Sequence, residues 1–294
     1  MSQKKLWIAL TAVIVLSFAV LLYYGNQIYQ QAPPVPAEVV DDTGTVLFTG
    51  GDIKDGQNIW QSIGGQEIGT VWGHGAYVAP DWTADYLHRE AQFLLNKWSQ
   101  ETHGTAFDQL TREQKATLES RLQTFLRENT YNASSGRLVI SRERYEAFLD
   151  NKAHYTGLFM NDPTLDELRN AYAIAKNTIK TEERMDKMVQ FFFWASWACV
   201  TNRPGQDITY THNWPPDEQI GNVPTSDLIL WTGFSIIMLL FGIGIMIFVH
   251  ARTRAEEILR PLDDPLMNQV VTPSMWAVKK YFWVVNLLIL AQVL

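Results

Sequence analysis

Apolar residues are concentrated in three blocks, and the long stretch between the first two mixes apolar and polar residues at helical spacing. The first block covers residues 6–24 and the second covers residues 228–250. Because about 20 apolar residues cross the hydrocarbon core of a bilayer, each of these blocks predicts a transmembrane helix. The third block, residues 281–294, follows Lys279 and Lys280 and is shorter, so we expect it to be the start of a third transmembrane helix.

Basic residues flank these blocks and predict their orientation. Lys4 and Lys5 precede the first block, and Arg252 and Arg254 follow the second. Because basic residues favour the cytoplasmic side of a membrane, both of these ends should be cytoplasmic. The predicted order is a cytoplasmic N-terminus (1–5), a first span (6–24), an outer segment (25–227), a second span (228–250), a cytoplasmic loop (251–280) and a truncated third span (281–294).

Two of these blocks have alternative interpretations. The first could be a cleaved signal peptide, but no small-x-small cleavage site follows promptly, and Tyr23 and Tyr24 resemble an interfacial aromatic belt, so an uncleaved anchor is favoured. The third could be a re-entrant or interfacial helix of a complete protein. However, fourteen helical residues rise only about 21 Å, and a helix ending inside lipid leaves carbonyls unsatisfied. We therefore expect the sequence to be the N-terminal part of a longer polytopic membrane protein.

The outer segment reads as a mainly α-helical domain. Threonine and glycine at positions 43 and 44, between β-branched runs, predict a hairpin within residues 39–48, and residues 137–141 predict a short strand. Capping residues and apolar periodicity predict the helices. These cover residues 52–62, a stretch from Asp81 or Thr83 to near Gly104, a stretch opened by the capping box at 111–114, residues 143–151, a stretch opened at 162–164, and residues 181–200.

The stretch 73–90 has the composition of a functional site. Gly73 and Gly75 allow close backbone approach or positive φ, and Pro80 forces an extended residue before it, so carbonyls could point outward. The alternative is a tight turn that only launches the following helix. His74 and His88 fit hydrogen-bonding histidines better than zinc ligands, since no second ligand lies at zinc spacing.

Composition excludes several classes of function. The single cysteine, Cys199, excludes an intramolecular disulfide and a covalent c-type haem, which requires Cys-x-x-Cys-His. The net charge of -7 lacks the excess of basic residues that is typical of nucleic-acid-binding proteins. Arg203, in a polar loop before the second span, could pair with a buried anion such as a haem propionate, or could be an interfacial anchor.

The anchor together with residues 52–61, 73–90, 201–204 and 213–215 resembles quinol-dependent nitric oxide reductase of the haem-copper oxidase superfamily, and the likeness covers essentially the whole chain. In that family the N-terminal region looks like a cytochrome c subunit that is fused to the catalytic bundle and has lost its haem. The sequence agrees, because residues 62–67 contain no cysteine or histidine where the cytochrome subunit has its haem-binding motif. The resemblance implies a mainly α membrane protein with a haem-free periplasmic cytochrome c-like domain, in the bacterial inner membrane.

The resemblance also implies the reaction and its cofactors. Electrons from quinol pass to haem b and then to a centre of haem b3 and non-haem iron, where two NO molecules become N2O and water. The histidine and glutamate ligands of these groups belong to later helices, so no catalytic residue is transferred and we expect this chain alone to be inactive. Gly75 and Tyr77 match a Gly-Ala-Tyr motif that helps to hold calcium near haem propionates, a role suited to carbonyl oxygens.

Three hypotheses follow. The leading one is the N-terminal part of a respiratory nitric oxide reductase, with quinol, the C-terminal transmembrane bundle, membrane lipid and a second copy in a homodimer as partners, and no nucleic acid. The alternative is a self-contained, membrane-anchored periplasmic binding or assembly protein without catalysis. An electron-carrying cytochrome is disfavoured because the covalent haem motif is missing.

Overall fold

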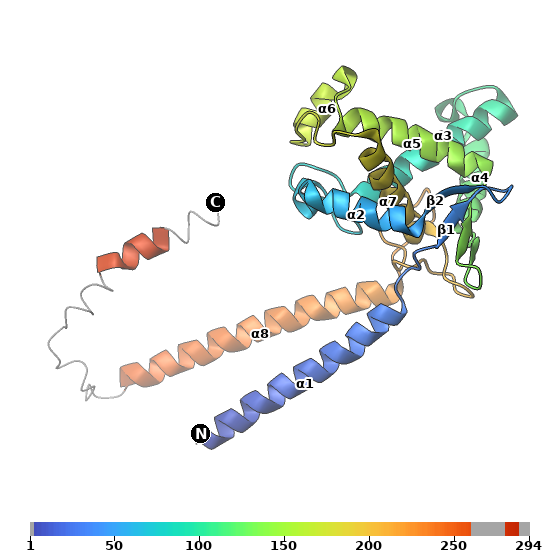
Figure 1. The fold of residues 1–294 in the computed structure, drawn as a ribbon. Helices are drawn as coiled ribbons and strands as arrows, with labels where there is room; N and C mark the ends of the chain where they lie inside the picture. The colour runs from blue at the N-terminus through green and yellow to red at the C-terminus, as the bar shows by residue number, and fades with distance from the viewer. Residues whose placement is uncertain (1–2, 260–279, 288–294) are drawn as a thin grey trace. The chain divides into compact units, whose positions relative to one another are not determined.

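The computed structural model describes residues 3–259 and 280–287, and its contacts divide the chain into two units, Met1–Leu228 and Ile229–Leu294 (Figure 1). The first unit contains helix α1 and a mostly helical domain with four short strands, residues 31–225, which we call the outer domain after the predicted outer segment. The second unit contains most of helix α8 and a short helical stretch at residues 280–287. Residues 288–294 of the expected third span lie outside the described residues.

Two long helices confirm the apolar blocks as helical. Helix α1 runs Gln3–Gln30 and α8 runs Ser226–Leu259, and each holds a stretch apolar and long enough to cross a bilayer, Leu10–Gln30 and Ser226–Arg254. Neither stretch is buried within the protein. The predicted cytoplasmic loop of residues 251–280 begins as a continuation of α8 over residues 251–259, because this Ala-, Glu- and Arg-containing stretch has good helix propensity and meets no proline before Pro261. The rest of that predicted loop, 260–279, lies outside the described residues.

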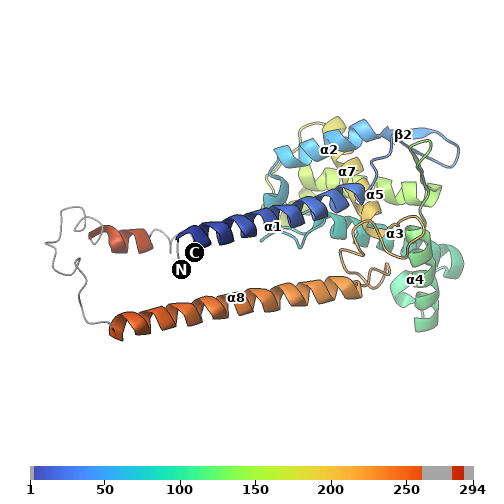
Figure 2. The ribbon, with the colours of Figure 1, turned by 90° about the horizontal axis from the view of Figure 1, so that it is seen from below.

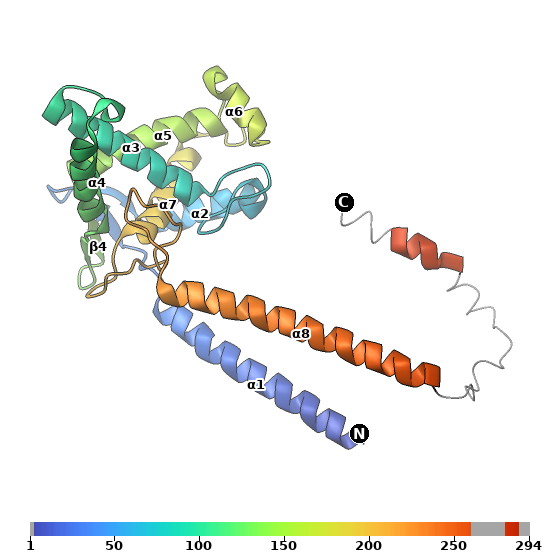
Figure 3. The same cartoon turned by 180° about the vertical axis from the view of Figure 1, so that it is seen from behind.

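Helix α7 (Glu182–Val200) is the centre of the outer domain. Thr181 caps its N-terminus by accepting the Arg184 amide, and every residue from 191 to 200 is buried. Helices α2 (Gly50–Ser62), α3 (Trp82–His103), α4 (Arg112–Arg127) and α5 (Arg142–Phe159) all contact α7 (Figures 1 and 3). This apolar segment therefore packs against the rest of the domain on every side.

Helix α2 packs closely against α7 at a glycine. Thr49 and Asp52 form a capping box at the start of α2, and Trp60 near its end packs on Phe191 with ring centroids 5.8 Å apart. A side chain at Gly56 would clash with the Lys187 carbonyl and lie 2.8 Å from the Phe191 Cβ. The two helix backbones can meet here only because position 56 has no side chain.

A small sheet closes one side of the domain in the order β2-β1-β4-β3. Strands β1 (Glu38–Val40) and β2 (Val46–Thr49) form the predicted antiparallel hairpin. Strand β4 (Arg137–Val139) is shorter than predicted, and it pairs parallel with β1 and antiparallel with β3 (Tyr131–Asn132). Val39 and Leu138 are fully buried and oppose each other in the parallel pair.

The remaining helices agree with the capping signals but differ in length. Asp81 caps α3 and Gly104 ends it in the left-handed conformation, while Thr111 and Gln114 form the predicted box at α4, which lies at the far end of α3 (Figure 2). Helix α5 extends to Phe159 instead of stopping at Asn151, since its last turns are buried in the core. The helix expected from 162–164 begins as a 3-10 turn, η3 (Pro163–Leu165), and continues as α6 (Asp166–Ala171); η1 (Gly65–Ile68) and η2 (Phe107–Gln109) are further 3-10 turns.

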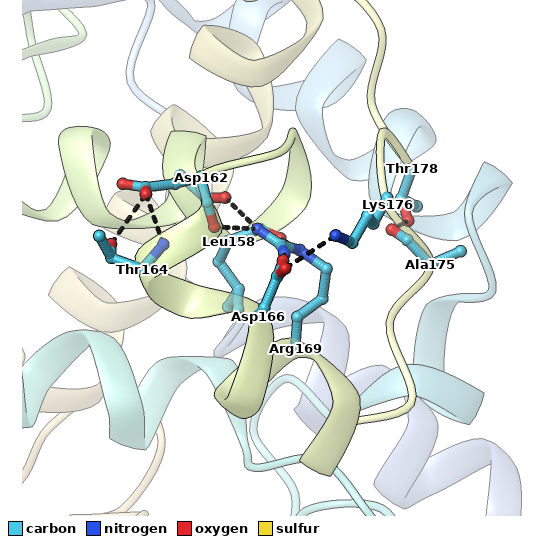
Figure 4. Close-up of polar contacts among 9 residues, drawn as sticks. Leu158, Asp162, Thr164, Asp166, Arg169, Ala175, Lys176 and Thr178 are labelled. Atoms are coloured by element: carbon cyan, nitrogen blue, oxygen red, sulfur yellow. Dashed lines mark hydrogen bonds and ion pairs between the residues drawn. The ribbon is translucent and has the colours of Figure 1, made fainter.

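Arg169 of α6 holds the C-terminus of α5 in place (Figure 4). It is fully buried, and its guanidinium donates to the carbonyls of Gly157, Leu158 and Asp162 at 2.8–2.9 Å and to the Asp166 carboxylate. Gly157 and Leu158 lie in the last turn of α5, where carbonyls have no partner further along the helix. The buried charge therefore stabilises the α5–α6 corner.

The close approach of α2 and α7 predicts a large effect of Gly56→Ala. The added methyl must displace the Lys187 carbonyl, so we expect the free energy of unfolding to fall by about 1–3 kcal/mol. Gly51→Ala is the matched control in the same helix, where the new atom would lie 3.5 Å from the Thr49 hydroxyl and meet nothing closer. Thermal unfolding should show a lower Tm for Gly56→Ala only, and equal Tm values for the two variants would contradict this packing.

Candidate functional site

The loop between η1 and α3, residues 69–81, closes on itself through backbone hydrogen bonds. Thr70 donates to the Pro80 carbonyl at 3.2 Å and accepts from the Trp82 amide at 2.7 Å. Near the tip, the Ala76 amide donates to the Ala79 carbonyl at 2.9 Å. Gly75, between these contacts, has a φ of 86°, a conformation that favours glycine. The predicted loop is thus an ordered structure that leads into α3.

The carboxylate of Asp81 organises this loop. One oxygen accepts the Thr70 hydroxyl and the Gly73 amide, both at 2.7 Å. The other accepts the amides of Thr83 and Ala84 at 3.0 Å, together with the Thr83 hydroxyl. Asp81 is only 6% exposed, so these donors replace the water that the carboxylate loses on folding. Asp81 therefore caps α3, as predicted, and also binds the loop.

A second loop, residues 201–225, lies against the first. His212 and Asn213 have φ values of 56° and 60°, uncommon for residues with side chains. Two hydrogen bonds between Asn213 and Thr209 hold this conformation. The Asn213 backbone amide donates to the Thr209 hydroxyl at 2.7 Å, and the Asn213 side-chain oxygen accepts the Thr209 backbone amide at 3.1 Å. Arg127 of α4 also donates to that oxygen at 3.2 Å. The second loop is therefore fixed to the helical scaffold.

Aromatic side chains join the two loops to each other and to α7. The Trp214 ring nitrogen donates to the Gly73 carbonyl at 2.9 Å, and the rings of His74 and Trp214 lie edge to face at 4.6 Å. The Trp72 ring nitrogen donates to the Ala195 carbonyl of α7 at 2.9 Å. Trp72 itself has a φ of 57°. Three non-glycine residues with positive φ thus meet in one region, as is common where structure serves a site.

Gly75 and Tyr77 lie at the tip of the first loop. The Gly75 amide donates to the Thr70 hydroxyl at 2.8 Å, which ties the tip to the Asp81 carboxylate. The Tyr77 side chain is fully exposed. Within residues 3–259 and 280–287, the carbonyl of neither residue accepts a hydrogen bond. Both oxygens are therefore free to contact a cation or another part of a larger assembly.

Arg203 lies in the second loop and is half-buried. It donates to the carbonyls of Thr209 at 3.2 Å and Tyr210 at 2.7 Å, and to the Gln31 side chain at 3.4 Å. Burial lowers the pKa of Arg203, but the group remains a cation at neutral pH. These contacts fix the guanidinium against the protein and leave one N–H on each terminal nitrogen. A contact with a haem propionate stays a prediction.

Other candidate ligands are dispersed. Among the residues that the structure describes, no group of three or more His, Cys, Asp or Glu side chains could hold a metal ion. Cys199 is buried, which raises the pKa of its thiol and keeps it neutral. Sequence reasoning recognised Asp81 only as a helix cap and missed its bonds to Thr70 and Gly73, since nothing in the spacing signals a contact across the loop.

Most of this domain matches a known protein family. The family model for the cytochrome c-like domain of the nitric oxide reductase NorB matches residues 36–216. The matched region begins just before β1 and includes the first loop of the site and residues 201–216 of the second. No curated protein matches the chain.

The five donors around Asp81 predict a severe effect of Asp81→Asn. The amide keeps the shape but places an NH2 group against hydrogen-bond donors, so we expect the free energy of unfolding to fall by about 2–3 kcal/mol. Limited proteolysis should also cut residues 70–80 faster than in the parent chain.

Asp162→Asn is the control for this substitution. Asp162 makes the same local bonds to the Thr164 amide (2.9 Å) and hydroxyl (2.8 Å), but its side chain reaches no distant loop. We expect a loss of less than about 1 kcal/mol. Similar losses for the two variants would show that the Asp81 carboxylate acts only as a local helix cap.

Proposed function

The chain belongs to the NorB family of nitric oxide reductases, and from that premise we propose that it is the N-terminal part of a quinol-dependent member. The complete enzyme would reduce two NO molecules to N2O and water, with two electrons from quinol and two protons. The observation that carries this proposal is the family match over the outer domain, joined to the cysteine content of that domain. We propose that this domain contributes structure and not electron transfer.

The quinol-dependent assignment is supported by the misfit between this domain and a covalent haem. Covalent attachment needs two cysteines, and Cys199 is the only one in the chain. The aromatic rings of Trp60, Phe191 and Trp194 pack against one another in the core, at centroid distances of 5.8 and 6.1 Å. With no c haem to accept electrons from a soluble cytochrome, the electrons of the complete enzyme would come from quinol in the membrane.

We propose that α1 and α8 cross the bacterial inner membrane and place the outer domain in the periplasm. Support comes from the two apolar stretches of 21 and 29 residues, and from the basic residues at the N-terminal end of α1 and near the C-terminal end of α8. The haem-copper-oxidase-like bundle, with haem b, haem b3 and the non-haem iron, would be built by residues beyond 294. Its surface, quinol, lipid and a second copy of the chain would be the partners.

We propose further that the loop tip contributes to a calcium site. Calcium takes six to eight oxygen ligands and accepts backbone carbonyls. The free carbonyls of Gly75 and Tyr77 are of this kind, and the other ligands would come from the bundle. Arg203 would use its remaining N–H groups on a haem propionate of the same region. Both roles concern binding and positioning, and none of the three residues would take part in the chemical step.

Haem content tests the proposed function. Native membranes solubilised in detergent and captured with an antibody against the outer domain should yield a polypeptide far larger than 33.6 kDa. Its reduced spectrum should show b-type haem without a c-type band. A haem-free protein of 33.6 kDa would contradict the proposal and favour a membrane-anchored binding or assembly protein.

The calcium proposal predicts different effects for two neighbouring substitutions. Gly75→Ala should weaken calcium binding, because the φ of 86° is strained by about 1–2 kcal/mol for alanine and the carbonyl must turn. Tyr77→Phe keeps the Tyr77 carbonyl and should bind calcium as the parent does. The measurement is the rise in Tm of the full-length protein as calcium is added after chelation. No calcium-dependent rise in the parent protein, or an equal rise in both variants, would contradict the site.

A further inference from the structure

Four polar side chains meet in the core between α3 and α5. Tyr86 and Glu90 lie one turn apart on α3, and Arg144 and Asn151 lie two turns apart on α5. Their exposed fractions are 0%, 0%, 5% and 1%. Polar groups this deeply buried need hydrogen-bond partners, because they have lost their water.

The bonds within this cluster leave four buried polar atoms unpaired. The Arg144 Nε donates to the Glu90 Oε1 at 2.9 Å, and the Asn151 amide donates to the Tyr86 backbone carbonyl at 3.4 Å. Four buried atoms have no partner in the protein: the Tyr86 hydroxyl, Glu90 Oε2, Arg144 Nη2 and Asn151 Oδ1. Two of these can donate and two can accept.

Tyr86 lies close enough to the other three side chains for each of them to affect its pKa. Burial raises the pKa of Tyr86 well above its usual value, the Glu90 charge raises it further, and Arg144 and the Asn151 side chain oppose that rise. Aromatic rings close the surroundings, since Tyr155 stacks on Tyr86 at 6.2 Å and the Arg144 guanidinium lies 5.5 Å from the Phe193 ring centroid. The cluster is therefore a group of polar side chains that the apolar core surrounds.

The chemistry of the unpaired atoms selects the ligand. Glu90 and Arg144 already cancel each other's charge, so neither an anion nor a cation is favoured. The requirement is a small neutral molecule that donates to Glu90 and Asn151 and accepts from Arg144 and Tyr86. Water meets it, and buried waters commonly make about three such bonds.

We propose that the outer domain contains an internal hydration site in which ordered water bridges Tyr86, Glu90, Arg144 and Asn151. The water joins α3 to α5 in the part of α3 that follows the Asp81 cap. It is thus a structural component of the scaffold beneath the loops of the site.

A structure of the full-length protein at a resolution that shows ordered water tests this directly. We expect density at about 2.7–3.2 Å from Glu90 Oε2, Arg144 Nη2 and at least one of the other two unpaired atoms. The proposal is overturned if the four side chains pair directly with one another, or if the space between them is empty.

Removing one hydroxyl provides a second test, on the full chain. If water bridges the cluster, Tyr86→Phe loses a hydrogen bond and should lower Tm by about 2–4 °C. If the hydroxyl is unpaired, the same change removes a desolvation cost, and Tm should stay the same or rise, which would overturn the proposal. Tyr155→Phe is the matched control, because that hydroxyl donates directly to Asp85 at 2.7 Å and its loss should lower Tm by a similar amount.

Discussion

The buried carboxylate of Asp81 is the interaction on which the candidate site depends. It joins the first turn of α3 to the loop before it, and the Thr70 hydroxyl extends the connection to the Gly75 amide. The direction of the carbonyls at the loop tip is therefore set by a chain of hydrogen bonds that begins at a helix end. A helix N-terminus also favours negative charge, so the same carboxylate is stabilised by α3 while it holds the loop.

Helix α7 makes this arrangement rigid. The Ala195 carbonyl of α7 accepts a hydrogen bond from the Trp72 ring nitrogen. The Ser196 hydroxyl of the same helix donates to the Thr83 carbonyl at 3.4 Å. Because residues 191–200 are all buried, these contacts involve the interior of the domain, where side chains are close-packed. A cytochrome c-like domain without covalent haem thus has an aromatic core of its own, which supports its proposed role as a scaffold for the membrane-embedded part of the enzyme.

Local chemistry explains what could be predicted from the sequence. Thr111, Gly104 and Asp81 marked helix ends correctly because capping involves residues within one turn. The β1–β4 pairing and the contact between Arg127 and Asn213 join residues far apart in the chain, so no local pattern signalled them. Helix α5 was predicted too short for the same reason, since the burial of Phe159 against the core decides where it ends. Short motifs indicated the family, whereas the roles proposed for Gly75, Tyr77 and Arg203 stay predictions, because no contact within the described residues tests them.

We propose that this domain belongs to an enzyme that takes electrons from quinol and not from a cytochrome. The most direct measurement is the rate of NO consumption, followed with an NO electrode, by the protein purified from native membranes and supplied with either reduced quinol or reduced cytochrome c. We expect rapid consumption with quinol, N2O as the product, and no consumption above background with cytochrome c. Consumption driven by cytochrome c, or none with quinol, would contradict the claim.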